Sequence, residues 1–155
     1  MSFRLAAYAV CIEHASVLLV RCTPPPGESV WSLPGGKVEH GEDPYETVSR
    51  EVAEETGLAV AVEQLLGVDS RLIPAHESYG GAEHQNVGIF YAVRVVGGDL
   101  RSELDGTTVE AAWRPLGDIG GLCRSSLVDV GLALARERPS TGHVATVPVG
   151  GLVRH

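Results

Sequence analysis

The sequence has few of the features that mark several large classes of protein. It contains only three cysteines, Cys11, Cys22 and Cys123, which are odd in number and show no CxxC spacing. Neither a disulfide framework nor a zinc knuckle is therefore expected. We interpret the three side chains as buried, unreactive thiols, and a cytoplasmic location is the corresponding expectation.

Long apolar runs and basic blocks are also missing. No stretch approaches the roughly 20 apolar residues that a membrane span requires, and the N-terminus lacks the pattern of a secretion signal. The 12 Lys and Arg residues are outnumbered by 20 Asp and Glu residues, which gives a net charge of -8. A nucleic-acid surface is not expected from this balance, and a small anionic substrate would have to be received through metal cations.

The length and the distribution of residues predict one domain over residues 1–155. The sequence shows no internal repeat and no low-complexity linker, and a chain of this size can bury one sizeable core. Residues 139–155 carry several glycines and few charges. We expect this tail to pack loosely, ordered only against the body or a partner subunit, so a homodimer is one expectation.

The chain order of apolar and polar stretches predicts a mixed α/β or α+β sandwich with helices on the sheet faces. Residues 3–12 and 16–21 are interpreted as a hairpin. Residues 59–73 are β-rich with a break around Glu63 and Gln64. The remaining expected elements are a polar loop over 74–85, a strand over 86–96, a strand over 108–115 and a helix over 125–136.

The clearest local signals lie between Leu33 and Leu58. Gly35 and Gly36 follow Pro34 and allow a tight turn, at which a ligand oxygen could reach the backbone amides. A helix is predicted from about Pro44 to Thr56, with Asp43 as its N-cap, Glu46 completing a capping box and Gly57 closing the last turn.

The predicted helix separates its residues into three groups when they are projected at roughly 100° per residue. Tyr45, Val48 and Val52 form an apolar stripe. Glu46, Ser49, Arg50 and Ala53 lie on the far side and should face water. Glu51, Glu54 and Glu55 form an arc of carboxylates beside the apolar stripe, where they repel one another.

This acidic arc has two interpretations. A divalent cation would remove the repulsion, because Mg²⁺ prefers carboxylate and water oxygens and bridges to substrate phosphates. The alternative is a solvated acidic helix face. The neighbouring glycine turn and the position of the arc against the core favour the metal site.

The same stretch resembles the Nudix hydrolase family, whose motif reads Gly-x5-Glu-x7-Arg-Glu-U-x-Glu-Glu-x-Gly-U, where U is aliphatic. Every fixed position of the motif is matched between Gly36 and Leu58, which makes it far more specific than a lone glycine-rich loop. The matching residues are Gly36, Glu42, Arg50, Glu51, Val52, Glu54, Glu55, Gly57 and Leu58. Weaker similarity extends to the approach at Trp31 and to the segment 110–116.

The resemblance implies an αβα sandwich with a mixed central sheet, and hydrolysis of a nucleoside diphosphate linked to another moiety with Mg²⁺ or Mn²⁺. It implies metal binding by Glu51, Glu54, Glu55 and the Gly36 carbonyl. One of the glutamates or a later carboxylate would activate water, so Glu51, Glu54 and Arg50 are the expected catalytic residues. Arg50 would orient the glutamates, and Glu42 would hold the loop or act at the metal through water.

Residues outside the motif leave several possibilities open. Gly35, Gly36 and His84 are the predicted substrate contacts. Pro74, at the sixteenth position after the motif, resembles a mark of ADP-ribose pyrophosphatases. Tyr79 and Trp113 are candidates for stacking on a base, against a surface and a core role respectively. The candidates for a late carboxylate are Glu77, Glu83, Glu103, Asp105 and Glu110.

Three functions are compatible with these features of the sequence. The first is a pyrophosphohydrolase acting on a small nucleotide, such as an ADP-ribose-like compound or a nucleoside triphosphate. The second is a nucleotide-sensing module that keeps the fold without hydrolysis. The third, an RNA-end hydrolase, is disfavoured by the acidic balance.

Overall fold

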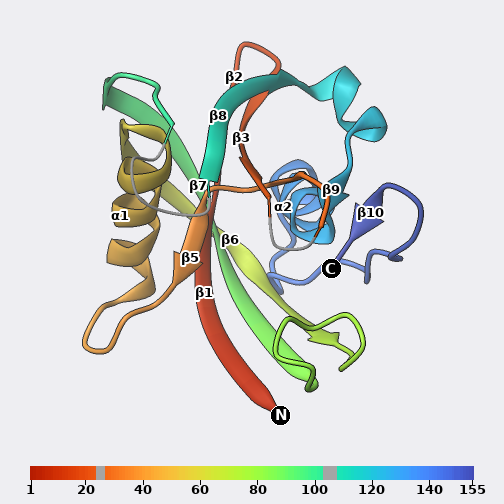
Figure 1. Cartoon of the computed structure of the whole chain (residues 1–155). Helices are drawn as coiled ribbons and strands as arrows, with labels where there is room; N and C mark the ends of the chain where they lie inside the picture. The colour runs from red at the N-terminus through yellow and green to blue at the C-terminus, as the bar shows by residue number, and fades with distance from the viewer. Residues whose placement is uncertain (24–26, 103–107) are drawn as a thin grey trace.

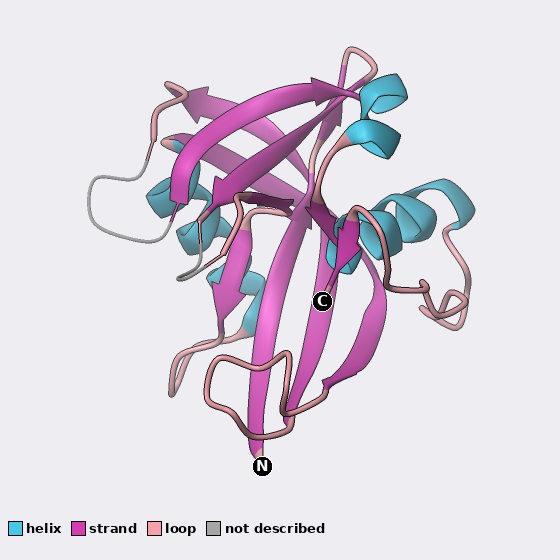
Figure 2. Ribbon diagram, turned by 45° about the vertical axis from the view of Figure 1, so that its right-hand side comes forward, coloured by secondary structure: helices cyan, strands magenta, loops and turns pink. Residues whose placement is uncertain are grey.

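Two mixed β-sheets form the centre of the molecule, and two α-helices flank them on opposite sides (Figures 1 and 2). The computed structural model describes residues 1–23, 27–102 and 108–155. The sequence-based expectation of a mixed α+β sandwich is confirmed. No helix among the described residues is long and apolar enough to cross a membrane.

The first sheet has four strands in the order β5-β1-β7-β6. Its members are β1 (Ser2–Val10), β5 (Gly35–Lys37), β6 (Leu58–Ile73) and β7 (His84–Gly98). β1 runs parallel to β7, whereas β5 and β6 are antiparallel to their neighbours. The strand expected at 86–96 therefore lies within β7. Because β7 begins at His84, the polar loop ends at residue 83 instead of the predicted residue 85.

The second sheet follows the order β10-β9-β4-β3-β2, and β8 also pairs with β3. Its strands are β2 (Ile12–Glu13), β3 (Ser16–Cys22), β4 (Val30–Ser32), β8 (Thr108–Pro115), β9 (Arg124–Ser125) and β10 (Val153–Arg154). The strand predicted at 108–115 is confirmed as β8. The 3₁₀ helix η1 (Leu116–Gly121) follows it.

The two helices agree closely with the sequence. α1 (Pro44–Thr56) has Asp43 as its N-cap, a complete capping box and Gly57 in a left-handed closing conformation. α2 (Ser126–Glu137) is capped by Ser125, whose side chain accepts a hydrogen bond from the Leu127 amide. Both helices were expected within one residue of these bounds.

Alternation along β1 divides the core into two halves, because successive side chains of a strand point to opposite faces. Ala6, Tyr8 and Val10 pack on the α2 side with Phe90 and Leu134. Ala7 and Ala9 pack on the α1 side with residues that include Val48 and Val52. β1 thus contributes to both halves of the core, as β3 and β7 also do.

The predicted hairpin between residues 3–12 and 16–21 is wrong. The first strand breaks at Cys11, and β1 pairs with β5 and β7 instead of β3. Only β2 pairs with β3, through Ile12 and Glu13, around a two-residue turn with positive φ at both positions. The break expected at Glu63 and Gln64 is a register shift within the continuous strand β6.

The C-terminal segment lies against the body at several points. The Gly142 carbonyl accepts a hydrogen bond from the Val68 amide at 2.9 Å, Val144 is buried in the core on the α2 side, and β10 pairs with β9. Cys11 is also buried, and burial together with the charge of Glu13 raises the pKa of its thiol to about 12. This agrees with an unreactive cysteine.

Candidate active site

The turn at Pro34–Gly36 lies beside the acidic helix α1 and packs against the central strand β1. The Pro34 carbonyl accepts a hydrogen bond from the Ala9 amide at 2.8 Å, and Gly35 has a φ of 154°. A Cβ atom at Gly35 would lie 2.2 Å from the Ala7 carbonyl oxygen. Only glycine fits this close approach, so the double glycine fixes the distance between the turn and β1.

The Gly36 position is shaped by an acidic side chain of α1. A Cβ atom there would lie 2.6 Å from Glu51 Oε1, so the carboxylate of Glu51 packs directly over the glycine backbone. The neighbouring Gly35 amide donates a hydrogen bond to Glu55 Oε1 at 2.8 Å. The Gly35 amide predicted for substrate binding therefore has a protein partner in this structure.

The three glutamates of the predicted arc differ in their surroundings. The Glu55 residue is buried, with 7% of its surface exposed, and its Oε2 accepts a hydrogen bond from the Thr108 hydroxyl at 2.9 Å. Half of the Glu54 side chain is exposed, compared with 16% of the Glu51 side chain. The arc thus runs from the core at Glu55 to solvent at Glu54.

Arg50 joins the acidic residues into one network. Its Nε and Nη2 atoms lie 2.6 and 2.9 Å from the two carboxylate oxygens of Glu42. Its Nη1 atom lies 3.1 Å from Glu51 Oε1 and 3.3 Å from Glu54 Oε2. The expectation that Arg50 faces water is wrong, because its long side chain turns back to reach the loop before the helix.

This network shifts the pKa values of Glu42 and Arg50. Hydrogen bonds from Arg50 and then from Thr47 lower the pKa of Glu42 to about 2. The hydrogen bond to Glu42 is in turn the largest cause that raises the pKa of Arg50. Both groups therefore stay charged at neutral pH, and Arg50 partly compensates the repulsion between Glu51 and Glu54.

Tyr45 also departs from the predicted apolar stripe. It is 57% exposed, and its ring meets Tyr91 edge-on with 6.4 Å between ring centroids. Val48 and Val52, the other two members of the stripe, are fully buried as expected. Thr47 fills the helix face beside them and donates a 2.6 Å hydrogen bond to Glu42.

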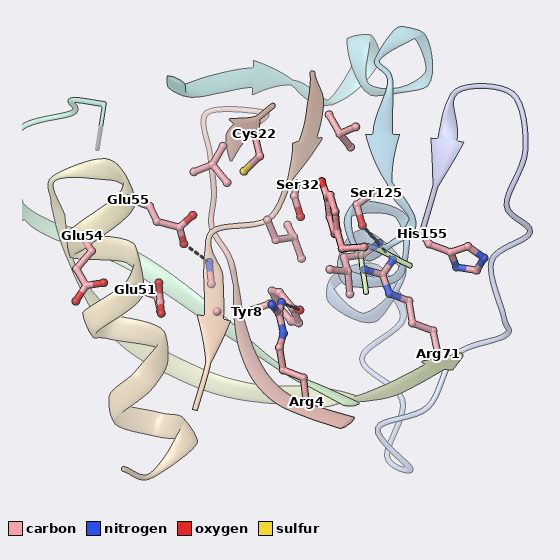
Figure 3. A pocket seen from close by; sticks show the side chains of 17 residues that line it. Arg4, Tyr8, Cys22, Ser32, Glu51, Glu54, Glu55, Arg71, Ser125 and His155 are labelled. Carbon is pink, nitrogen blue, oxygen red and sulfur yellow. Dashed lines mark hydrogen bonds between the residues drawn. The ribbon is translucent and has the colours of Figure 1, made fainter. Parts of the chain in front are cut away.

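The acidic arc opens onto a cavity of about 660 Å³ (Figure 3). Gly35, Gly36 and all three glutamates line it. Among the other residues of the cavity wall, sequence reasoning had named only Tyr79 as a candidate contact. These further lining residues are Arg4, Tyr8, Val20, Cys22, Val30, Ser32, Leu33, Arg71, Tyr79, Ser125, Leu127 and His155.

Other predicted contacts lie away from this cavity. His84 begins β7 and its Nδ1 atom lies 2.7 Å from the Ser2 hydroxyl, and it does not line the cavity. Trp113 packs in the core on the α1 side, whereas Tyr79 lines the cavity. Among the candidate late carboxylates, Glu77, Glu83 and Glu110 do not line it, and Glu103 and Asp105 lie outside the described residues.

The donor chemistry of the arc fits a hard divalent cation, because three carboxylates and the Gly36 backbone border one solvent-accessible cavity. In the described ranges, however, no three acidic, histidine or cysteine side chains are already gathered in a metal-binding arrangement. Arg50 lies between Glu51 and Glu54, and Glu55 is turned toward Gly35 and Thr108.

Comparisons with known proteins agree with this architecture. The model of the NUDIX domain matches residues 2–128. The chain is 37% identical over 106 residues to an ADP-ribose pyrophosphatase of Methanocaldococcus jannaschii, covering 68% of this chain and 59% of the relative. It is 39% identical over 93 residues to the putative mutator protein MutT4 of Mycobacterium tuberculosis, covering 60% of this chain and 36% of that protein.

A solved structure shows the same arrangement. The MutT protein from Methanosarcina mazei Go1 superimposes with a TM-score of 0.67 at 26% identity, covering 88% of this chain and 95% of that one. The chain spans between about one third and three fifths of the length of the two curated relatives above. With the motif complete and most of the chain matched by the domain model, the chain belongs to the NUDIX family.

Proposed function

We propose that the protein is a metal-dependent pyrophosphohydrolase that cleaves a nucleoside diphosphate linked to another moiety. The observation that carries this proposal is the Arg50 network, which gathers Glu42, Glu51 and Glu54 beside Gly36 at one end of the cavity. A binding module would have no need for such a set of carboxylates facing a ligand cavity.

In this proposal Mg²⁺ or Mn²⁺ would be held by Glu51, Glu54, Glu55 and the Gly36 carbonyl. The cation would supply neutralisation of the charge that develops on the phosphate oxygens. A carboxylate of the arc, Glu51 or Glu54, accepts a proton from the attacking water as its oxygen bonds to phosphorus. The bridging P–O bond then breaks, and the second phosphate leaves with the bond electrons.

Arg50 acts as a positioning residue in this scheme. Its guanidinium holds Glu42 with two hydrogen bonds and keeps Glu51 and Glu54 on the cavity side of the helix. Gly35 and Gly36 allow the turn to lie close to the carboxylates of Glu51 and Glu55, because neither glycine has a Cβ atom that would occupy this space.

The relatives suggest where to look for the substrate. One matched relative is an ADP-ribose pyrophosphatase, and a human relative, 34% identical over 105 residues, is an 8-oxo-dGDP phosphatase. We therefore propose a small nucleotide substrate, of either the ADP-ribose type or the nucleoside di- or triphosphate type.

A substrate panel tests the proposal. Purified protein would be incubated with ADP-ribose, other nucleoside diphosphate conjugates and nucleoside triphosphates, with Mg²⁺, Mn²⁺ or EDTA. We expect cation-dependent release of phosphate-containing products from at least one compound. Tight binding of one compound without turnover of any would contradict the proposal and favour a nucleotide-sensing module.

A cytoplasmic location and a homodimer remain secondary proposals. The edge strand β6 carries the exposed side chains of Leu65 and Leu72, which another copy could cover. Sedimentation velocity at several protein concentrations would measure the oligomeric state directly.

A further inference from the structure

The cavity has a second charged end, opposite to the glutamates, that the proposed hydrolysis does not use. Figure 3 shows Glu51, Glu54 and Glu55 on the α1 side, and Arg4, Arg71 and His155 away from them, on the other side of strand β5. We call this second group the arginine end; it consists of Arg4, Arg71, Tyr8, Ser125 and His155.

The register of the first sheet places the two arginines in one row. Arg4 of β1 and Arg71 of β6 both pair with Asn86 of β7, which lies between them. Directly paired residues project from the same face of a sheet, and two strand spacings separate their backbones by roughly 10 Å. Both guanidinium groups are thereby directed to the same side of the sheet as Tyr8.

The contacts of these arginines are with neutral groups. Arg4 donates to the Asn86 side-chain carbonyl and to the Tyr8 hydroxyl, both at 3.1 Å. Arg71 Nη1 donates to the hydroxyls of Ser125 and Ser126, at 3.1 and 2.7 Å. Within the described part of the chain, neither guanidinium lies within ion-pair distance of a carboxylate.

Positive charge at the arginine end is therefore poorly compensated. Burial lowers the pKa of Arg71, and the charge of Arg4 contributes to the same shift, while Asp69 and Tyr8 oppose it. Asp69 is the acidic residue whose field reaches Arg71, and burial raises its own pKa. The N-terminus of α2, capped by Ser125, adds the positive end of a helix dipole.

A buried donor at this end also lacks an acceptor. Among the described residues, Arg71 Nε has no hydrogen-bond partner although it is buried. His155, at the same end, has its Nε2 atom 3.2 Å from Glu77. Buried charges in proteins are normally paired because an unpaired one is costly, so the arrangement favours a ligand that brings negative oxygen atoms.

We infer that the arginine end binds an oxyanion group, a phosphate or a carboxylate, carried by the ligand at a position away from the anhydride that is hydrolysed. Arg4 and Arg71 are the specificity-determining residues of this subsite. The inference rests on the proposed function only in placing the scissile anhydride at the glutamates. Binding at the arginine end requires no cation and no turnover.

Three ligands on one scaffold test the inference. Adenosine, adenosine 5′-monophosphate and adenosine 5′-carboxylic acid carry no anion, a phosphate and a carboxylate, respectively. Their dissociation constants would be measured by calorimetry in EDTA, so that the glutamates hold no cation. We expect at least one anionic ligand to bind roughly 10- to 100-fold more tightly than adenosine, as for hydrogen bonds to charged groups.

Substitutions assign the preference to this end. Arg71→Gln and Arg4→Gln should each reduce the anion preference toward unity, whereas Arg71→Lys should keep part of it because the charge remains. Arg94→Gln is the matched control, since Arg94 is an exposed arginine of β7 outside the cavity. Thermal unfolding checks that each variant is folded, and Arg4→Gln decides the question if Arg71→Gln does not fold.

Two results would overturn the inference. One is equal affinity for adenosine and both anions in the unsubstituted protein, which would mean that the arginines contact neutral acceptors such as a base edge. The other is an anion preference that survives both glutamine substitutions. Both results are distinct from a failure of the proposed hydrolysis, because binding is measured in EDTA and turnover is measured separately with the cation present.

Discussion

The two ends of the cavity carry opposite charges, and the charged side chains at the two ends have different kinds of partner. At the acidic end, the one guanidinium of Arg50 binds Glu42, Glu51 and Glu54, so that these carboxylates share a positive partner although this end stays negatively charged. At the arginine end, Arg4 and Arg71 contact only neutral acceptors among the described residues. One end is arranged before any ligand arrives, and the other still lacks a counter-charge.

This difference indicates separate tasks. Positioned carboxylates suit chemistry, because a reaction gains most from groups whose orientation is fixed in advance. An uncompensated positive site suits recognition, because the ligand itself relieves the unpaired charge. Substitutions at the acidic end should therefore change turnover, and substitutions at the arginine end should change affinity or stability.

The largest expected effect is that of Glu54→Gln. Removing this carboxylate charge should lower turnover by about 10²- to 10⁴-fold, as is typical for the loss of a catalytic group, because Glu54 is a proposed metal ligand and proton acceptor. The measurement is kcat with Mg²⁺ on the best compound of the panel, together with thermal unfolding. Glu137→Gln, at the exposed end of α2, makes the same charge change as a control. Near-normal turnover in Glu54→Gln would contradict the metal assignment.

A smaller loss is expected for Arg50→Lys. Lysine keeps the charge but cannot bond Glu42 through two nitrogens while reaching Glu51 and Glu54. We expect a 10- to 100-fold loss in cation affinity or activity, roughly that seen when groups supporting metal ligands are changed. The measurement is the Mg²⁺ concentration for half-maximal turnover, with Arg94→Lys as the control. An unchanged value and unchanged turnover would show that Arg50 does not position the ligands.

The acidic end was predictable from the sequence because its residues are close together in the chain. The caps of α1, the glycine turn and the arc of carboxylates all lie between Leu33 and Leu58, where local rules of helix formation apply. The helical projection still placed Arg50 toward water, although the family resemblance put it beside the glutamates. A helical projection gives the direction of the Cα–Cβ bond, and a long side chain can end far from that direction.

The arginine end could not be predicted from local patterns, since it combines β1, β6, β7 and the N-terminus of α2. The parallel pairing of β1 with β7 joins residues about 80 positions apart, such as Arg4 and Asn86. Because β1 pairs with β7 and β5, the hairpin predicted at the N-terminus does not form. One signal was present: Arg4 has the same parity as Ala6, Tyr8 and Val10, so it lies on a core-facing side of its strand.

A moderate effect on stability is expected for Ser126→Ala at the arginine end. Ser126 accepts the shorter of the two hydrogen bonds from Arg71, at 2.7 Å, and Ser125 remains as a second acceptor. We expect a loss of about 1 kcal/mol in the free energy of unfolding, measured by urea denaturation. Ser140→Ala changes an exposed serine and serves as the control. Equal stability of the two variants would mean that Ser126 does not hold Arg71.

The smallest expected effect is a pH-dependent one at the acidic end, in Glu42→Gln. Because the folded protein lowers the pKa of Glu42 from 4.5 to about 2, the ionised carboxylate stabilises the folded state. This contribution is complete above pH 4.5 and disappears as the pH falls toward 2, since protons then bind both states equally.

The melting temperatures of Glu42→Gln and the unsubstituted protein should therefore differ at neutral pH and converge as the pH falls from 4.5 toward 2. Glutamine keeps one oxygen, which can accept from Thr47 and from Arg50 Nη2, but its amide nitrogen cannot accept from Arg50 Nε. The difference therefore reports the lost charge together with this one hydrogen bond. Glu137→Gln makes the same substitution at an exposed position of α2 and serves as the control. A constant difference between Glu42→Gln and the unsubstituted protein across this pH range would mean that the charge of Glu42 does not stabilise the folded state.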